Sequence, residues 1–196
     1  MLGILRQASL LWAFVIVTNA QEVPLEKAGP AKLEFEAPVI GESVFKEGLG
    51  LVDRERDEYA SAIATFAANH VVRKQGDKAS LDFARKALGL ALHLSSRNKR
   101  AMVTKFQLSK GILPKTIDPE YSPQTLAGLF MTRAEVLFEQ KGEKNLLLAR
   151  ALIELAVTID PHNEDSIYAY ELQKIDYGEL KWAPFTEAQK PKPTKP

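Results

Sequence analysis

The chain of 196 residues contains no cysteine. This absence excludes disulfide bonds, thiolate zinc sites and cysteine nucleophiles. It also excludes a lipoprotein anchor, which needs a cysteine to carry the lipid. A fold of this chain must therefore be held together by a hydrophobic core, and the chain is long enough to build one.

The sequence also lacks the common catalytic and metal-binding motifs. Its histidines are His70, His93 and His162, and no two of them have the i, i+4 spacing of a helical zinc site. There is no Gly-rich phosphate loop and no Gly-x-Ser-x-Gly motif. We expect each histidine to have a structural role at the surface or at the edge of the core. We therefore predict no enzyme, no cofactor and no metal site; catalytic residues that converge from distant helices are the remaining alternative.

Long hydrophobic runs are scarce, and the clearest one lies near the N-terminus. Arg6 is the only charged residue in the first 20, an apolar run from Ala8 to Val17 follows, and Thr18 and Ala20 are small residues suited to a cleavage site. This order is typical of a secretory signal peptide. The run is shorter than the roughly 20 apolar residues that span a bilayer. We predict a signal peptide over residues 1–20 and an exported, periplasmic or secreted protein; an uncleaved anchor is the alternative.

Two further segments lack the pattern of regular structure. Prolines and glycines interrupt residues 21–52, which we predict to be an extended N-terminal arm. Its expected anchors on the body are Leu33, Phe35, Val39 and Ile40. Residues 179–196 are predicted to be a C-terminal segment with a disordered Lys/Pro tail, in which Trp182 and Phe185 cap the last helix.

The sequence contains one pattern twice, in residues 84–98 and again 65 positions later in residues 149–163. The matched pairs are Ala84/Ala149, Arg85/Arg150, Leu90/Leu155, Ala91/Ala156 and Asn98/Asn163. Each copy follows a glycine turn, at Gly76 and at Gly142. Such self-similarity is typical of helical repeats that bury their apolar faces on one another. It favours a binding scaffold over a catalyst.

Apolar residues at helical spacing predict an all-α domain of about six helices over residues 53–178. The expected helices cover residues 53–74, 78–94, 99–109, 123–140, 144–159 and 164–175. Between the third and the fourth, residues 111–123 hold three prolines and predict a long loop, which is an independent candidate contact.

The second copy carries small and large apolar residues at fixed helical positions, followed by a closing proline and asparagine. These positions are Met131, Ala134, Phe138, Gly142, Ala149, Ile153, Ala156, Pro161 and Asn163. In this it resembles the tetratricopeptide repeat (TPR) family, with departures at Glu135, where the family prefers glycine, and at Ser96, where the first copy lacks the proline. The resemblance implies a short α-solenoid of helical hairpins whose concave face takes peptides or protein segments.

The resemblance also implies which residues contact the partner. Polar positions on the first helix of each hairpin would line the concave face, and the third helix would add to it. Independently of the resemblance, the proline loop adds Tyr121 as a candidate contact. These residues are His70, Arg73, Lys74, Arg100, Lys105, Tyr121, Thr132, Glu139 and Gln140. Each of them is equally compatible with an ordinary solvated helix surface.

Charge is distributed unevenly along the chain. Between Asp82 and Asp118 there are eight basic residues and no acidic one, whereas from Asp118 to Glu187 there are 13 acidic and 6 basic residues. The basic middle can pack against the acidic second half, within one molecule or between two, or it can steer an anionic partner.

We therefore predict an exported scaffold that binds a protein or peptide partner in a cell-envelope or secreted assembly. One alternative is a structural module that self-associates, for example as a homodimer. Another is a binder of anionic glycans or lipid headgroups through residues 85–115, with membrane contact at most peripheral. The balanced total charge and the absence of aromatic residues interleaved with the basic ones argue against nucleic acid.

Overall fold

The computed structural model describes residues 33–45 and 49–188, and all structural statements here concern that part of the chain. It contains seven helices and no strand within these ranges. The helices are α1 (Asp53–Arg73), α2 (Lys78–Leu94), α3 (Lys99–Ser109), α4 (Pro123–Gln140), α5 (Glu143–Ile159), α6 (Glu164–Tyr177) and α7 (Ala183–Thr186). The predicted all-α class is confirmed for these residues, and the first six helices lie close to their predicted ranges. The predicted signal peptide and Lys/Pro tail lie outside the described residues.

Polar side chains determine where most of these helices begin. Asp77, Asn98, Ser122 and Asn163 each accept a hydrogen bond from the backbone N–H three residues further on, which satisfies a donor that the first helical turn leaves free. Asn98 and Asn163 are equivalent positions of the repeat. The repeat therefore fixes the start of α3 and of α6 in the same way.

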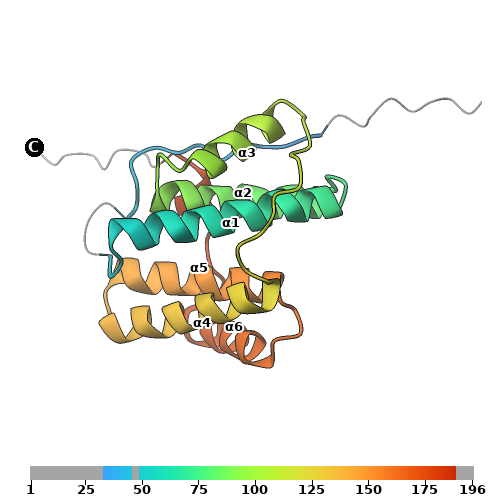
Figure 1. The fold of residues 1–196 in the computed structure, drawn as a ribbon. Helices are drawn as coiled ribbons and strands as arrows, with labels where there is room; N and C mark the ends of the chain where they lie inside the picture. Colours follow the sequence, from blue (N-terminus) through green and yellow to red (C-terminus); the bar gives the residue numbers. More distant parts are fainter. Residues whose placement is uncertain (1–32, 46–48, 189–196) are drawn as a thin grey trace, which may run out of the picture. The chain divides into compact units, whose positions relative to one another are not determined.

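The helices form two hairpins, α1 with α2 and α4 with α5, which lie one above the other in Figure 1. Helix α3 packs on α1 and α2, and helix α6 packs on α5. In Figure 1 α3 lies above the first hairpin, while the second hairpin and α6 lie below it. The order in space is thus α3, α1/α2, α4/α5, α6, which differs from the order along the chain.

Side chains join the two hairpins. The ring centroids of Tyr59 on α1 and Phe130 on α4 lie 5.8 Å apart. Beside them Arg133 Nη2 donates a hydrogen bond of 2.7 Å to Glu55 Oε1. The core of both hairpins consists mainly of fully buried alanine and leucine side chains. Small alanines allow the paired helices to approach closely, and the leucines supply the apolar area that stabilises them.

The described residues of the N-terminal arm, 33–45 and 49–52, contact this core through three of the four expected anchors. Leu33, Phe35 and Ile40 are partly buried and pack against the core, whereas Val39 is exposed. The Val39 backbone N–H instead donates a hydrogen bond of 3.0 Å to the carbonyl oxygen of Thr186. The backbone of this residue, rather than its side chain, joins the arm to the C-terminal segment.

The prediction that Trp182 and Phe185 cap the last long helix is wrong. Helix α7 packs on α2, and Phe185 is fully buried against Phe45 of the arm, with their ring centroids 5.7 Å apart. The physical reason is Gly89 on α2: a Cβ built there would lie 2.4 Å from the carbonyl oxygen of Phe185. Only glycine lets the backbone of α7 come this close.

The prediction that His93 lies at the surface or at the edge of the core is wrong. Its side chain is only 1% exposed because the arm covers this end of α2. The backbone N–H of Val44 donates to His93 Nδ1 at 3.3 Å, and the buried His93 Nε2 has no hydrogen-bond partner among the described residues. The bond at Nδ1 requires the neutral ring with its proton on Nε2.

Within the described ranges, no helix is long and apolar enough to cross a membrane.

Candidate functional site

One face of α1 carries a stripe of polar residues spaced by four. These residues are Ser61, Thr65, Asn69 and Arg73. Four-residue spacing places them on the same side of the helix. This side faces the space between α3 and the long connection that leads from α3 to α4.

The stripe holds both walls of this space in place. The side chain of Asn69 binds the backbone of Ile117 in the connection twice: its Nδ2 donates to the carbonyl oxygen at 2.7 Å, and its Oδ1 accepts from the N–H at 2.8 Å. On the other wall, Asn98 Nδ2 of the α3 cap donates to Ser61 Oγ at 2.7 Å. Arg100 Nη1 donates to Thr65 Oγ1 at 2.5 Å. Preorganised walls reduce the entropy lost when a ligand binds.

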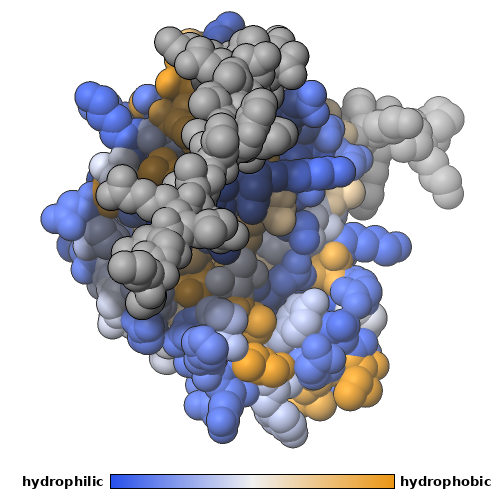
Figure 2. Space-filling model, turned by 90° about the vertical axis from the view of Figure 1, so that its right-hand side faces the viewer, coloured by the Kyte–Doolittle hydropathy of each residue, from blue (hydrophilic) through white to orange (hydrophobic). Residues whose placement is uncertain are grey.

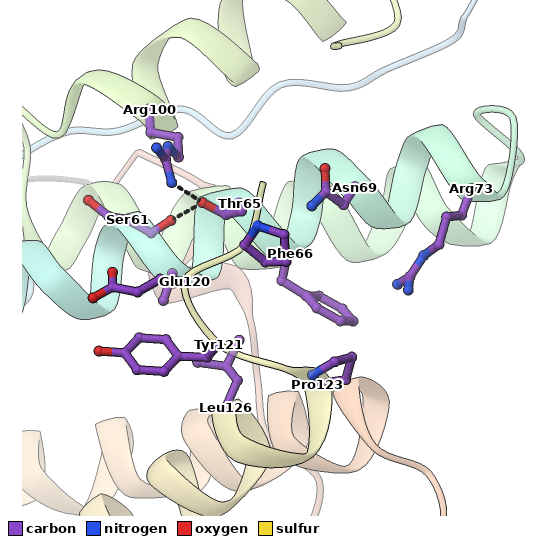
Figure 3. A pocket seen from close by; sticks show the side chains of 12 residues that line it. Ser61, Thr65, Phe66, Asn69, Arg73, Arg100, Glu120, Tyr121, Pro123 and Leu126 are labelled. Atoms are coloured by element: carbon purple, nitrogen blue, oxygen red, sulfur yellow. Dashed lines mark hydrogen bonds between the residues drawn. The ribbon is translucent and has the colours of Figure 1, made fainter. Parts of the chain in front are cut away.

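A pocket lies where α1, the connection and the start of α4 meet (Figure 3). Arg100 reaches it from α3 on one side, and Tyr121 and Leu126 approach from the other. Its volume is about 70 Å³. Its lining is mixed, with apolar side chains and a few polar groups: Ser61, Ala62, Thr65, Phe66, Asn69, Arg73, Arg100, Pro119, Glu120, Tyr121, Pro123 and Leu126.

A wider depression of about 690 Å³ shares Ser61, Arg100 and Glu120 with this pocket and extends along α3. Its other lining residues include Lys99, Val103, Gln107, Pro114 and Lys115. We call the pocket and the depression together the α1 groove. Concave sites with an apolar floor and a few placed polar groups are typical of ligand binding.

Basic groups outnumber acidic ones in the lining of the α1 groove, with Arg73, Lys99, Arg100 and Lys115 against Asp57 and Glu120. Neither Arg73 nor Arg100 forms an ion pair with a carboxylate within the described ranges. The guanidinium of Arg73 instead lies 5.5 Å from the centroid of the Phe66 ring. Of the acidic residues in the lining, Asp57 already accepts hydrogen bonds from Ser95 and Asn98. The groove therefore favours an anionic ligand.

A tyrosine hydroxyl adds a neutral polar group. The carboxylate of Glu120 is the largest cause that raises the pKa of Tyr121 above its usual value. A hydrogen bond to Glu120 also contributes to this shift, so that Tyr121 and Glu120 act as a pair at the edge of the groove.

The structure brings three of the nine predicted contact residues together in the α1 groove: Arg73, Arg100 and Tyr121. The others lie elsewhere. His70 stacks on Phe66 at a centroid distance of 5.6 Å and lies tilted against Phe83 at 5.1 Å. Its burial is the main cause that lowers its pKa.

The remaining predicted residues occupy separate places around the molecule. Lys74 is the C-cap of α1, and Lys105 lies on α3 beside Met102 and Phe106. Thr132 lines a depression between α4 and α6. Glu139 and Gln140 are at the exposed end of α4, where Gln140 lies against Gly50. The predicted residues thus do not share one face.

Three residues that shape the groove, Asn69, Thr65 and Ser61, were not among the predicted contacts. The resemblance to TPRs implied only the polar residues at the end of α1, His70, Arg73 and Lys74. The four-residue spacing from Ser61 to Arg73 is the signal that could have identified them. The pairing of Asn69 with Ile117 could not have been found, because it depends on where the long connection crosses α1.

Comparison of the chain with protein-family models, with curated proteins and with solved structures gives no match, so that the likeness to tetratricopeptide repeats rests on the residues of this chain alone.

Proposed function

We propose that this protein is a helical scaffold that binds a segment of a partner protein in the α1 groove. The observation that carries the proposal is a pocket of mixed lining beside two arginines, Arg73 and Arg100, that have no carboxylate partner in the described part of the chain. Guanidinium groups match carboxylates in geometry and form strong charge-assisted hydrogen bonds.

The chemistry of the groove defines the segment that fits it. The small pocket against Phe66, Ala62 and Leu126 suits one short apolar side chain. Arg100 at the junction and Arg73 at the rim suit an acidic side chain, or a chain-terminal carboxylate, beside it. The wider depression along α3 accommodates the rest of an extended segment. The ligand class is therefore a peptide with an apolar residue next to an acidic one.

The type of scaffold that we propose is TPR-like. Two helical hairpins with small residues between their helices support it, together with the asparagine caps at Asn98 and Asn163 and the turn at Gly142, where φ is +93°. The position of α3 is a departure from a continuous solenoid, because α3 and the second hairpin lie on opposite sides of the first (Figure 1). We propose two TPR-like hairpins with α3 folded back over the first of them.

We also propose that the scaffold acts in a cell-envelope or secreted assembly. This part rests on the sequence of residues 1–20, with one charged residue followed by an apolar run. Secreted proteins without disulfides depend on their packed core, and the buried alanines and leucines of the two hairpins supply one.

The proposal is tested by selecting peptides from a random display library on the purified protein and measuring the affinity of the selected sequences by calorimetry. We expect the selected peptides to share an acidic residue next to an apolar one. We expect Arg100→Glu and Arg73→Glu each to weaken their binding at least about tenfold, which is about 1.4 kcal/mol. The two variants should lose more affinity for these peptides at low ionic strength than at high ionic strength, because salt screens the charges.

Lys74→Glu is the matched control. It makes the same change of charge one residue from Arg73, but Lys74 does not line the groove. If Lys74→Glu weakens binding as much as Arg73→Glu, the effect comes from total charge and the α1 groove is not the binding site. Selection of peptides without acidic residues would also contradict the proposal.

A further inference from the structure

Helix α6 exposes apolar side chains along one face. Tyr168, Leu172 and Ile175 are 70%, 43% and 79% exposed, and their i, i+4, i+7 spacing places them in one stripe. Figure 2 shows hydrophobic residues reaching the surface at its lower edge, the level at which Figure 1 places α4 and α6. An exposed stripe of this kind on a stable helix marks a contact surface.

Helix α3 exposes a second apolar surface. Met102 and Phe106, one helical turn apart, are 53% and 61% exposed. They border a groove of about 470 Å³ between α3, the arm and α2, to which Ile40 and Leu92 contribute. We call this groove the α3 face, and the stripe of Tyr168, Leu172 and Ile175 the α6 face.

The two faces carry opposite charge. Helix α3 contains three basic residues and no acidic one; Lys105 lines the α3 face, whereas Lys99 and Arg100 line the α1 groove. Helix α6 contains four acidic residues and one lysine. That lysine, Lys174, lies between two carboxylates, 3.8 Å from Glu171 and 3.2 Å from Glu179, so that it does not reverse the charge of the face.

The shapes of the two faces also correspond. The α3 face is a groove with Lys105 at its edge, whereas the α6 face is a row of protruding side chains with Glu171 and Asp176 beside it. Pairing α3 with α3 would bring lysines together, and pairing α6 with α6 would bring carboxylates together. Only the α3 face against the α6 face matches both charge and shape.

We propose that α6 of one copy of this chain docks on the α3 face of the next copy, with Leu172 and Ile175 inserted beside Met102 and Phe106. The two faces lie at opposite ends of the helix stack (Figure 1). The contact is therefore heterologous: each copy offers one face to each neighbour, so that copies add head to tail into an open chain or a closed ring. The surface is separate from the pocket of the α1 groove and goes beyond peptide binding.

Two variants that each disable one face test the proposal. Phe106→Asp places an acidic group on the α3 face, where it loses the apolar contact and repels α6. Ile175→Asp removes the apolar anchor of the α6 face. Both side chains are more than half exposed, so we expect unchanged helical content by circular dichroism and unchanged thermal unfolding.

The masses of the species are measured by analytical ultracentrifugation over a range of protein and salt concentrations. We expect the mass of the wild-type protein to rise with its concentration and to fall with added salt. Each variant alone should stay monomeric, because each has lost one of the two faces that must meet. An equimolar mixture of the two variants should form a 1:1 dimer and nothing larger, because one intact α3 face and one intact α6 face remain.

A wild-type protein that is monomeric at every concentration would overturn the proposal, as would a mixture that stays monomeric. Association of Ile175→Asp by itself would overturn it too, since that result requires an interface between two like faces. Peptide binding measured on Phe106→Asp separates the two proposals: this variant keeps Arg73 and Arg100, so that peptide affinity should remain when self-association is lost.

Discussion

The two copies of the repeat, residues 84–98 on α2 and residues 149–163 on α5, share a sequence pattern but are covered differently. Every residue of α2 from Ala87 to Leu94 is buried, whereas α5 keeps exposed or partly exposed positions through the same stretch. The difference arises because the arm and α7 cover α2. A repeated pattern thus determines the helix and its cap, while the segments outside the repeat determine how deeply that helix is buried.

The equivalent arginines of the two copies show the same principle. Arg85 Nη2 lies 3.0 Å from Glu36 Oε1 of the arm, and Arg150 Nη2 donates to the carbonyl oxygen of Gly178 after α6. In both residues Nε is buried and makes no hydrogen bond within the described part of the chain. One position of the repeat therefore holds a flanking segment in each copy, by an ion pair in the first and by a backbone contact in the second.

Gly89 and Glu154 also occupy equivalent positions of the repeat, and their different residue types determine which contacts each makes with the C-terminal segment. Gly89 admits the backbone of Phe185, and Glu154 Oε1 accepts hydrogen bonds from Trp182 Nε1 at 2.7 Å and from Lys86 Nζ at 3.1 Å. The C-terminal segment thus touches both copies at one repeat position. It joins the two hairpins because the two copies differ there.

The largest effect on stability should come from adding a side chain to the first copy at this position. Gly89→Ala places a Cβ 2.4 Å from the Phe185 carbonyl oxygen and 3.2 Å from its carbon, both backbone atoms of a buried segment. Alanine gains up to about 1 kcal/mol of helix propensity, but displacing α7 costs more. We expect a net loss of about 1–3 kcal/mol in the free energy of unfolding, measured by urea denaturation.

Gly128→Ala is the control for this change. Gly128 lies within α4, and a Cβ built there meets nothing within 4 Å. The same substitution should therefore stabilise the protein by about 0.5–1 kcal/mol. Equal effects of the two substitutions would mean that α7 does not pack against Gly89.

A second, smaller difference between the copies depends on pH. His93 on α2 is buried under the arm, whereas its equivalent on α5, Thr158, is exposed. Burial lowers the pKa of His93 below the ordinary value of 6.5. Its charged neighbour on α1 is Arg56, whose Nη2 lies 3.5 Å from the His93 carbonyl oxygen. A proton on Nδ1 would also remove the acceptor for the Val44 N–H.

The unfolded chain therefore binds a proton at His93 more readily than the folded chain. The stability from this residue is fully present above about pH 6.5 and is lost as the pH falls below it, by at most about 1.4 kcal/mol per pH unit. We expect urea midpoints measured about one unit above and one unit below pH 6.5 to differ less in His93→Gln than in the wild-type protein. The same midpoints are measured for His70→Gln as a comparison variant, because burial lowers the pKa of His70 as well. An unchanged pH dependence in His93→Gln would contradict the assignment.

These comparisons show which parts of the structure the sequence could predict. The helices and their caps follow from local signals, such as Asn98 and Asn163, whose side chains act within one turn. The burial of His93 and the docking of Phe185 on α2 were mispredicted because both depend on contacts between residues far apart in the sequence. At the α1 groove, Arg73 and Arg100 were predicted from the helix positions that the resemblance to TPRs implies, while Asn69 was missed because its partner lies 48 residues away.

The smallest effect on the free energy of unfolding should come from changing the contacts of the two equivalent arginines, Arg85 and Arg150. Glu36→Gln should cost at most about 1 kcal/mol, since Glu36 is largely exposed and surface ion pairs contribute little. This loss should vanish at high salt, which screens exposed charges. Arg150→Lys should lose a comparable amount, but the loss should persist at high salt, because Arg150 donates to a neutral carbonyl group and its guanidinium lies 5.5 Å from the centroid of the Tyr177 ring. Urea denaturation of both variants at low and high salt measures this difference. If the effect of Glu36→Gln does not depend on salt, the arm is held by packing at Leu33 and Phe35 rather than by charge, and the equivalence of the two arginines is then one of position only.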